Sequence, residues 1–236
     1  MKTNVIHINL LNKNILFVFV LLFSFSSFSQ LEKKEQRTAS DARAPLSKIL
    51  IKSSFRLPNL TSNTFLKENS NGIADVSLGF NYGFYKKFYV GLGYRYSNFQ
   101  ISDKKLRSNP KEQLNADIHQ YGIYGELSYF INLGEVFTLE TNIQAGENNI
   151  FVTSTPCSNL GKKGIAKKGL FYSPNVIIYL RGEEDLSFNL TIGYTFTNNN
   201  FKPEDVCKTE FKDYETTNFE PSYQYINVGF GIAYSF

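Results

Sequence analysis

Cys157 and Cys207 are the only cysteines in this chain of 236 residues, so a disulfide is the first chemistry that the sequence allows. The segment over 148–168 has four lysines and no acidic residue, whereas the segment over 199–222 has six acidic residues and three lysines. Opposite charge draws the two segments together, and an oxidising compartment favours the bond. We predict a Cys157–Cys207 disulfide, and two free thiols are the alternative.

Charged residues at alternate positions of otherwise apolar segments form a second set that could do chemistry. An unpaired charge is costly away from water, so we predict that these residues share a narrow interior and pair across it. The expected result is a salt-bridged plug that fixes register and blocks flow, and the alternative is an ion path or gate. The set consists of Lys48, Lys52, Arg56, Asp75, Arg95, Glu126 and Glu140.

Motifs for other kinds of chemistry are missing from the sequence. It has no glycine-rich phosphate loop, nucleophile elbow or zinc motif, and two cysteines without a nearby histidine do not make a ligand set. We therefore expect neither a cofactor nor a metal. Cleavage of the N-terminal signal peptide that we predict below removes two lysines and no acidic residue, which lowers the formal net charge from +4 to +2 (4 − 2). The mature chain is therefore nearly neutral, and we expect no nucleic-acid partner.

Eight segments alternate between large apolar residues and small or polar ones. This is the pattern of strands whose two faces have different surroundings. At the end of the chain, Ile232, Tyr234 and Phe236 share one face, while Ala233 and Ser235 lie on the other. The segments are SKILIKSSFRL, ADVSLGFNYGF, KKFYVGLGYRYSNF, HQYGIYGELSYFINL, VFTLETNIQAG, GLFYSPNVIIYLRG, LSFNLTIGYTFT and YQYINVGFGIAYSF.

Short and long connections alternate between these segments. Hairpin-length turns occur at YKK, LGE and GEED, and four longer stretches separate the other segments, the third of them over 148–168. An even number of strands with short turns on one side and long loops on the other is the layout of bacterial outer-membrane barrels. We predict an all-β fold, an eight-stranded antiparallel up-and-down transmembrane β-barrel with short periplasmic turns and four long extracellular loops.

The apolar face of these strands is predicted to point outward. It holds roughly forty large residues, whereas the interior of an eight-stranded barrel is just wide enough for side chains to fill. The opposite face is rich in glycine, serine, asparagine and threonine and fits inside. The alternative is a soluble barrel with an apolar interior, as in lipocalins.

The start of the chain is typical of a cleaved secretory signal. Two lysines precede an apolar run over 15–25, which is too short to span a bilayer as a helix, and small residues follow it. We predict a signal peptide over 1–29, a flexible periplasmic lead-in over 30–46 and one barrel domain over 47–236.

The whole predicted barrel resembles the small OmpA/OmpX-type outer-membrane barrels. The terminal VGFGIAYSF is similar to the C-terminal signal that the barrel-assembly machinery recognises, and its signal residues are Phe230, Ile232, Tyr234 and Phe236. The resemblance implies assembly by that machinery in the outer membrane of a Gram-negative bacterium, contact with outer-membrane lipids and both termini in the periplasm. We expect a monomer.

This architecture hosts adhesins, structural anchors, small channels and lipid-modifying enzymes, so the fold does not decide the activity. Some eight-stranded barrels deacylate lipid A with a His/Ser/Glu site in which a serine follows the histidine by two residues; two residues after His119, this chain has Tyr121. We therefore expect no enzyme, but a structural or surface-binding role that the extracellular loops carry above a plugged lumen. The alternatives are a narrow channel for ions or small solutes and, less favoured, a lipid A-modifying enzyme.

Overall fold

The computed structural model describes residues 48–102, 115–134, 136–159, 164–182, 185–199, 201–206 and 222–236. The predicted signal peptide (1–29), the whole lead-in (30–46) and residue 47 of the barrel domain lie outside these ranges, so their boundaries stay predictions. The described residues form eight strands, namely β1 (Ile49–Leu60), β2 (Ser70–Tyr85), β3 (Phe88–Ser102), β4 (Asn115–Asn132), β5 (Phe137–Ser154), β6 (Ile165–Arg181), β7 (Leu186–Thr197) and β8 (Gln224–Ser235).

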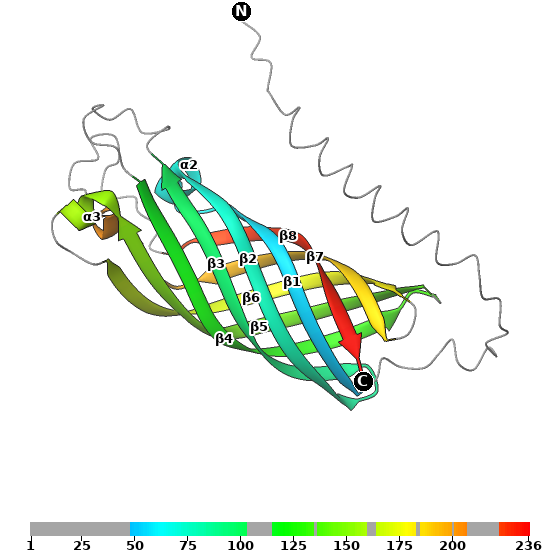
Figure 1. The fold of residues 1–236 in the computed structure, drawn as a ribbon. Helices are drawn as coiled ribbons and strands as arrows, with labels where there is room; N and C mark the ends of the chain where they lie inside the picture. The colour runs from blue at the N-terminus through cyan, green and yellow to red at the C-terminus, as the bar shows by residue number, and fades with distance from the viewer. Residues whose placement is uncertain are drawn as a thin grey trace, which may run out of the picture. The chain divides into compact units, whose positions relative to one another are not determined.

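The eight strands close into a barrel in sequence order, and each strand is antiparallel to both of its neighbours (Figure 1). β1 and β8 complete the closure, with a register that runs from Leu50 opposite Ser235 to Leu60 opposite Tyr225. Closure pairs the two terminal strands, which would otherwise be free sheet edges. The predicted eight-stranded up-and-down barrel is confirmed.

Short turns and long connections lie at opposite ends of the barrel. The short turns are at 86–87, 133–136 and 182–185, and Gly134 takes a φ of 100°, which glycine adopts without strain. The last residue, Phe236, lies at the same end, where its backbone N–H donates to the carbonyl of Ile49 at 2.9 Å. Figure 1 shows the C-terminus at this end and the short helices of the long connections at the other.

Large apolar side chains cover the outside of the barrel, as the alternation predicts. Leu92 and Ile123, for example, are 68% and 66% exposed to the surroundings of the barrel, whereas the alternate positions face inward and are buried. A soluble protein rarely exposes a continuous apolar surface of this kind, but a lipid bilayer covers it favourably. The soluble barrel with an apolar ligand cavity does not fit this arrangement.

Many outward-facing aromatic rings form two belts, as expected at the two interfaces of a membrane, although others, such as Phe55, Phe80 and Phe230, point outward and belong to neither belt. On β4 the belts are marked by Tyr129 and Tyr121, which are eight residues apart (129 − 121). At 3.3 Å per residue and a tilt near 40°, this separation is roughly 20 Å along the axis. The inner belt is Phe84, Phe88, Tyr129, Phe137, Phe188, Tyr234 and Phe236, and the outer belt is Tyr94, Tyr96, Tyr121, Tyr172, Tyr194 and Phe196.

The predicted long connection over 148–168 is wrong in extent. β5 continues to Ser154 and β6 starts at Ile165, and the two strands stay paired to Val152 opposite Ile165. The reason is that the inward side chains of this extension, such as Ile150 and Val152, are apolar and fully buried, so the extended sheet has a core of its own.

Short helical turns lie in the described parts of the connections at this end. α2 (Thr64–Asn69) begins after Asn63, whose side chain accepts from the backbone N–H of Leu66 at 3.2 Å, and it buries Leu66. α3 (Thr155–Asn159) follows β5, and the 3-10 turn η2 (Pro203–Val206) precedes β8. Among the described residues, no helix has the length and apolar character needed to cross a membrane.

Candidate functional site: charged clusters inside the barrel

Arg56 on β1, Asp75 on β2 and Arg95 on β3 form a buried cluster that we call the arginine cluster. Strand register creates it, because Arg56 lies opposite Asp75 and Arg95 lies opposite Ser77, the next inward residue on β2. Nε of Arg56 donates to Oδ1 of Asp75 at 3.0 Å, and Nε and Nη2 of Arg95 donate to Oδ2 at 2.9 and 2.5 Å. Two guanidinium groups therefore share one carboxylate, and the cluster has a formal charge of +1.

Residues of three further strands contact the guanidinium of Arg95. Its Cζ lies 5.4 Å from the ring centre of Phe171 on β6 and 5.6 Å from that of Tyr225 on β8. Its Nη2 also donates to Oγ1 of Thr195 on β7 at 3.0 Å. The cluster thus connects β1, β2 and β3 with β6, β7 and β8 across the interior.

Lys52 on β1, Glu126 on β4 and Glu140 on β5 form a second buried cluster, which we call the lysine cluster. Nζ of Lys52 forms an ion pair with Oε1 of Glu126 and lies 2.7 Å from Oε1 of Glu140. One ammonium group is shared by two carboxylates, so the formal charge is −1. These ion pairs join strands that are not neighbours in the barrel, which means that they cross the lumen.

Neutral donors surround the two carboxylates of the lysine cluster. Glu126 accepts from two side-chain amides at 2.6 and 2.8 Å, and Glu140 accepts from an amide at 2.7 Å and a tyrosine hydroxyl at 2.5 Å. A serine hydroxyl lies 2.7 Å from an oxygen of each carboxylate. Such bonds stabilise a buried anion without adding charge. The donors are Asn81, Gln144, Asn142, Tyr179 and Ser128.

Tyr124 lies on the inner face of β4, two residues from Glu126 and on the side of the arginine cluster. Its ring passes close to both β3 and β2. A Cβ at Gly93 on β3 would lie 2.3 Å from its Cζ, and a Cβ at Gly79 on β2 would lie 3.0 Å from its hydroxyl oxygen. The ring also packs edge-on against Phe171, with centroids 6.3 Å apart. Glycine at positions 79 and 93 therefore makes room for an aromatic ring in the narrow lumen.

Buried apolar side chains close the interior on both sides of the charged clusters. We call the group near the short turns the inner apolar layer and the group near the long connections the outer apolar layer. The inner layer is Leu50, Tyr89, Phe130, Ile177, Tyr179 and Ala233. The outer layer is Leu60, Leu66, Phe99, Ile101, Ala116, Ile118, Ile150, Val152, Phe201, Val206, Tyr223 and Tyr225.

Each apolar layer contacts one of the charged clusters. Tyr225 of the outer layer lies against the guanidinium of Arg95, and Tyr179 of the inner layer donates to Glu140. Along the barrel the order is therefore inner apolar layer, lysine cluster, arginine cluster and outer apolar layer. Together these layers fill the lumen with side chains.

Six of the seven residues predicted as a lumen charge network lie in the two clusters. The prediction was wrong for Lys48. This residue is exposed and precedes β1, at the end of the barrel, so it does not belong to the lumen charge network. The alternation of the sequence places it on the face of Lys52 but does not show that the strand begins only at Ile49.

The predicted C-terminal signal residues lie on the outer face of the closing strand. Phe230, Ile232, Tyr234 and Phe236 are all exposed, with Tyr234 and Phe236 in ring contact at 4.7 Å. Their recognition by the assembly machinery stays a prediction.

The connections around the two cysteines meet where α3 and η2 pack together. Sγ of Cys157 lies 3.8 Å from the carbonyl oxygen of Asp205, and Oγ of Ser154 donates to the carbonyl of Val206 at 3.0 Å. An ion pair joins Lys167 on β6 to Asp205. Cys207 follows Val206 directly but lies outside the described residues, so the disulfide stays a prediction.

His119 lies on the outer face of β4, level with the outer aromatic belt. Its Nδ1 lies 2.8 Å from the hydroxyl of Tyr96 and 3.0 Å from the amide nitrogen of Asn98, both on β3. Glu126 and Glu140 lie in the lumen, on the other side of the sheet. The side-chain partners of His119 are thus a tyrosine hydroxyl and an amide, and neither is the serine or the carboxylate of a lipid A deacylase site. The described residues also contain no cluster of histidine, cysteine and acidic side chains arranged for a metal.

Sequence reasoning missed the two apolar layers. The available signal was that both faces become apolar near strand ends, as in Ile150, Phe151 and Val152, or in Phe130 and Ile131. The alternation pattern alone does not reveal the layers, because it assigns one face of each strand as apolar and disregards apolar residues on the opposite face.

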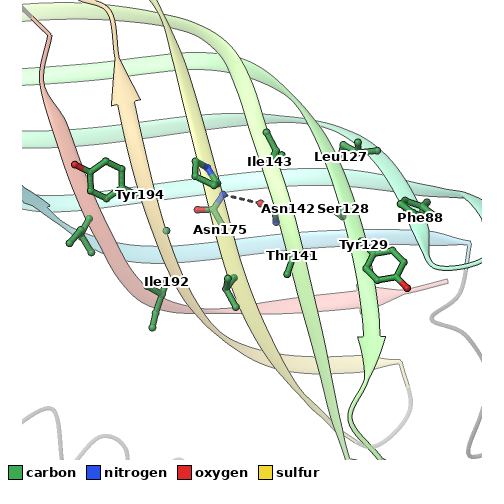
Figure 2. Close-up of a pocket in the computed structure, with 14 residues that line it drawn as sticks. Phe88, Leu127, Ser128, Tyr129, Thr141, Asn142, Ile143, Asn175, Ile192 and Tyr194 are labelled. Atoms are coloured by element: carbon green, nitrogen blue, oxygen red, sulfur yellow. Dashed lines mark hydrogen bonds between the residues drawn. The ribbon is translucent and has the colours of Figure 1, made fainter.

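A groove of about 610 Å³ crosses the outer wall of the barrel (Figure 2). Figure 2 shows Phe88 and Tyr129 at one end of it and Ile192 and Tyr194 at the other, with Asn175 bonded to Asn142 at 2.9 Å between them. Its rim consists mainly of outward apolar side chains of the lipid-facing surface, and its lining also includes the inward polar residues Ser128, Asn142 and Asn175.

Comparisons with known proteins support the fold. No protein family model matches the chain, and no curated protein matches it either. Among solved structures it is similar to Neisserial surface protein A, with a TM-score of 0.53 and 9% identity over 82% of this chain and 100% of that one. OprG of Pseudomonas aeruginosa gives 0.46 and 14% over 82% and 99%, and Ail of Yersinia pestis gives 0.45 and 11% over 80% and 100%.

Proposed function

We propose, on the premise that the chain has the fold of small eight-stranded outer-membrane barrels, that it is a non-conducting outer-membrane protein whose extracellular end has a structural or surface-binding role. The observation that carries the proposal is the closure of the charged interior by an apolar layer on each side. An ion that crossed the barrel would have to displace both layers and break buried ion pairs.

The outer layer supports this proposal most strongly. It combines residues of the strand extensions with Leu66 of α2 and with Phe201 and Val206 beside and in η2. The parts of the connections that the structure describes therefore fold inward over the lumen. A connection anchored in this way presents a defined surface to the outside, which suits a binding or shielding role.

The outer surface of the barrel supports a location in the outer membrane. The apolar band between two aromatic belts fits a bilayer, and the end with the long connections faces outward in barrels of this layout. In this arrangement the lipids of the outer membrane contact the barrel, both ends of the barrel domain lie in the periplasm and the assembly machinery recognises the exposed residues of β8. The protein acts as a monomer, since closure leaves no strand edge between β1 and β8.

A narrow channel is the second candidate, and the charged middle of the lumen favours it. Six charged residues in a transmembrane segment are expensive and often mark an ion path. In the channel hypothesis, the two clusters exchange partners and the apolar layers move apart during opening.

Planar-bilayer recordings of the purified protein test the proposal. We expect no single-channel steps above the baseline of the bilayer, for the wild type and for Glu126→Gln. A double variant, Phe99→Ala with Tyr223→Ala, removes two large rings of the outer layer and is the matched opening control. Regular conductance steps from the wild type, altered in size by Glu126→Gln, would instead establish the channel.

Location is tested by fractionation and electrophoresis. We expect the protein in the outer-membrane fraction, with an unboiled band that moves at a different apparent mass from the boiled band. A soluble protein without this heat shift would contradict the membrane assignment itself. Samples with and without reductant, compared with Cys157→Ser, also test the proposed disulfide: a reductant-dependent shift is expected only in the wild type.

A further inference from the structure

We propose that the arginine cluster is a binding site for one small monovalent anion, chloride in a physiological medium, held by the guanidinium edge of Arg95. The inference does not depend on the role of the extracellular end. It starts from an imbalance of charge: Arg56 and Arg95 carry two positive charges, and Asp75 carries one negative charge. All three side chains are at most 4% exposed, so bulk water does not stabilise the surplus.

Oδ2 of Asp75, the oxygen bonded to Arg95, has no remaining capacity to accept hydrogen bonds. The other oxygen, Oδ1, receives one hydrogen bond, from Nε of Arg56 at 3.0 Å; Nη2 of Arg56 lies 2.6 Å away as an ion pair but, within the described residues, has no hydrogen-bond partner. Oδ2 receives Nε and Nη2 of Arg95 and, at 2.8 Å, the hydroxyl of Ser97. A carboxylate oxygen has two lone pairs, so Oδ2, with three donors, is saturated and cannot serve a further N–H of Arg95.

Arg95 has a donor left over. Within the described part of the chain, its Nη1 is buried and has no hydrogen-bond partner, while its other two nitrogens are bonded. The rings of Phe171 and Tyr225 lie over the guanidinium at 5.4 and 5.6 Å. These rings cover the group but cannot accept in its plane, so the free direction is the N–H edge. A buried donor on a charged group without an acceptor is costly.

The lysine cluster does not remove the surplus. Its formal charge is −1, but both carboxylates are bonded to Lys52 and to neutral donors. Lys52 and Arg56 are four residues apart on β1 (56 − 52), which places the two clusters on the order of 13 Å apart along the strand. Coulomb attraction weakens with distance, so an anion in contact compensates Arg95 better than a carboxylate in the other cluster.

A small, singly charged anion fits these constraints. The excess is one unit, so a monovalent ion neutralises the cluster, whereas a phosphate or sulfate would reverse its sign. Oδ1 of Asn227 also lacks a partner among the described residues, and the amide nitrogen of Asn227 donates to the same Oγ1 of Thr195 as Arg95, so a neutral acceptor lies near the site. Water alone at Nη1 of Arg95 is therefore the competing result.

The test of the site is an unfolding experiment on the full mature chain in detergent. The loss of the heat-sensitive band measures how much protein has unfolded. Sodium chloride is compared with sodium gluconate at equal ionic strength, since gluconate is too large to enter. If the site binds chloride, each tenfold increase in chloride above its dissociation constant raises the folded-to-unfolded ratio by up to about tenfold. Crystals grown in bromide provide the second readout, an anomalous peak at Nη1 of Arg95.

Three variants separate the site from other anion effects. Arg95→Gln leaves a balanced Arg56–Asp75 pair and is expected to lose both the chloride dependence and the bromide peak. Lys167→Gln removes a lysine at the rim and is expected to keep both. Glu140→Gln removes one negative charge from the lysine cluster and is expected to strengthen chloride binding. Equal stability of the wild type in chloride and gluconate, or water alone in the bromide map, would overturn the proposal.

Discussion

The arginine cluster and the lysine cluster both bury a surplus charge in the lumen, but the charges have opposite signs and are stabilised by different kinds of contacts. Each places three charged groups in the lumen and leaves one unit of charge over. The lysine cluster surrounds its surplus negative charge with neutral donors, among them Asn81, Gln144 and Tyr179. The arginine cluster has few acceptors besides Asp75, mainly Thr195 and the faces of two rings. Hydrogen-bond supply, more than charge count, therefore distinguishes the two.

The difference follows from which side chains can serve each sign. Serine, asparagine, glutamine and tyrosine all donate, and the small inward residues of a barrel are mainly of these types. An excess carboxylate thus finds partners easily on the inner face. A surplus guanidinium needs acceptors, of which a carboxylate is the strongest, and only Asp75 is within reach. The variants below either break this contrast or sharpen it, in order of decreasing effect.

Asp75→Asn is expected to have the largest effect. It leaves Arg56 and Arg95 buried without a counter-charge, which costs about 3–5 kcal/mol of unfolding free energy. The measurement is urea unfolding in lipid vesicles, followed by tyrosine fluorescence or by the heat-sensitive band. Asp117→Asn, on the outer face of β4, is the matched control and should change little. Equal stability of the two variants would show that the arginine cluster is not stabilised by its carboxylate.

Lys52→Met is expected to cost less than Asp75→Asn, because neutral donors continue to bond both carboxylates. We expect a loss of about 2–4 kcal/mol in the same unfolding experiment. Adding Glu126→Gln to Lys52→Met lowers the negative charge by one and should recover part of the loss. A double variant no more stable than Lys52→Met would argue against a charge-based explanation.

Tyr179→Phe removes one of the neutral donors and keeps the ring of the inner apolar layer. Its hydroxyl donates to Oε2 of Glu140 at 2.5 Å, and loss of a bond to a charged group costs about 1.5–3 kcal/mol. The outward Tyr172→Phe, on the same strand, is the control. A similar small effect for both variants would mean that the bond contributes little to Glu140.

Ser54→Ala is expected to have the smallest effect and to set the baseline. Oγ of Ser54 lies 2.7 Å from Oγ of Ser77, on the inner face between the two clusters, and bonds no charged group there. Loss of this neutral bond costs about 0.5–1.5 kcal/mol. A loss of unfolding free energy as large as that of Tyr179→Phe would show that hydrogen bonds to charged groups do not contribute more than neutral ones in this lumen.

The sequence predicted the architecture well because the architecture depends on a period of two. Every strand shows large apolar residues such as Leu92 and Ile123 on one side and small or polar residues on the other, and a one-residue shift would reverse the faces. The number of strands, their antiparallel order and the outward direction of the apolar face all follow from this pattern. The extent of β5 and β6 did not follow, because Ile150, Phe151 and Val152 make both faces of β5 apolar, while β6 begins with a stretch that contains Lys167 and Lys168, so neither extension shows the alternation.

The candidate site was predicted only in composition. The alternation of the sequence showed which charged residues point inward, namely Lys52, Arg56, Asp75, Arg95, Glu126 and Glu140. It also placed Lys48 among them, although that residue is exposed at the end of the barrel. Their division into two clusters could not be read. Arg56 and Asp75 meet through neighbouring strands, but Lys52 meets Glu126 and Glu140 across the lumen.

The sequence by itself therefore determined that this protein is an eight-stranded barrel with an apolar outside and a charged inside, because side-chain alternation is a local property. Only the tertiary structure decided that the inside is closed by apolar layers and that its charges form two oppositely unbalanced groups. Those features depend on which residues meet across the barrel. That is set jointly by strand register, tilt and closure, and no segment of the chain carries this information alone.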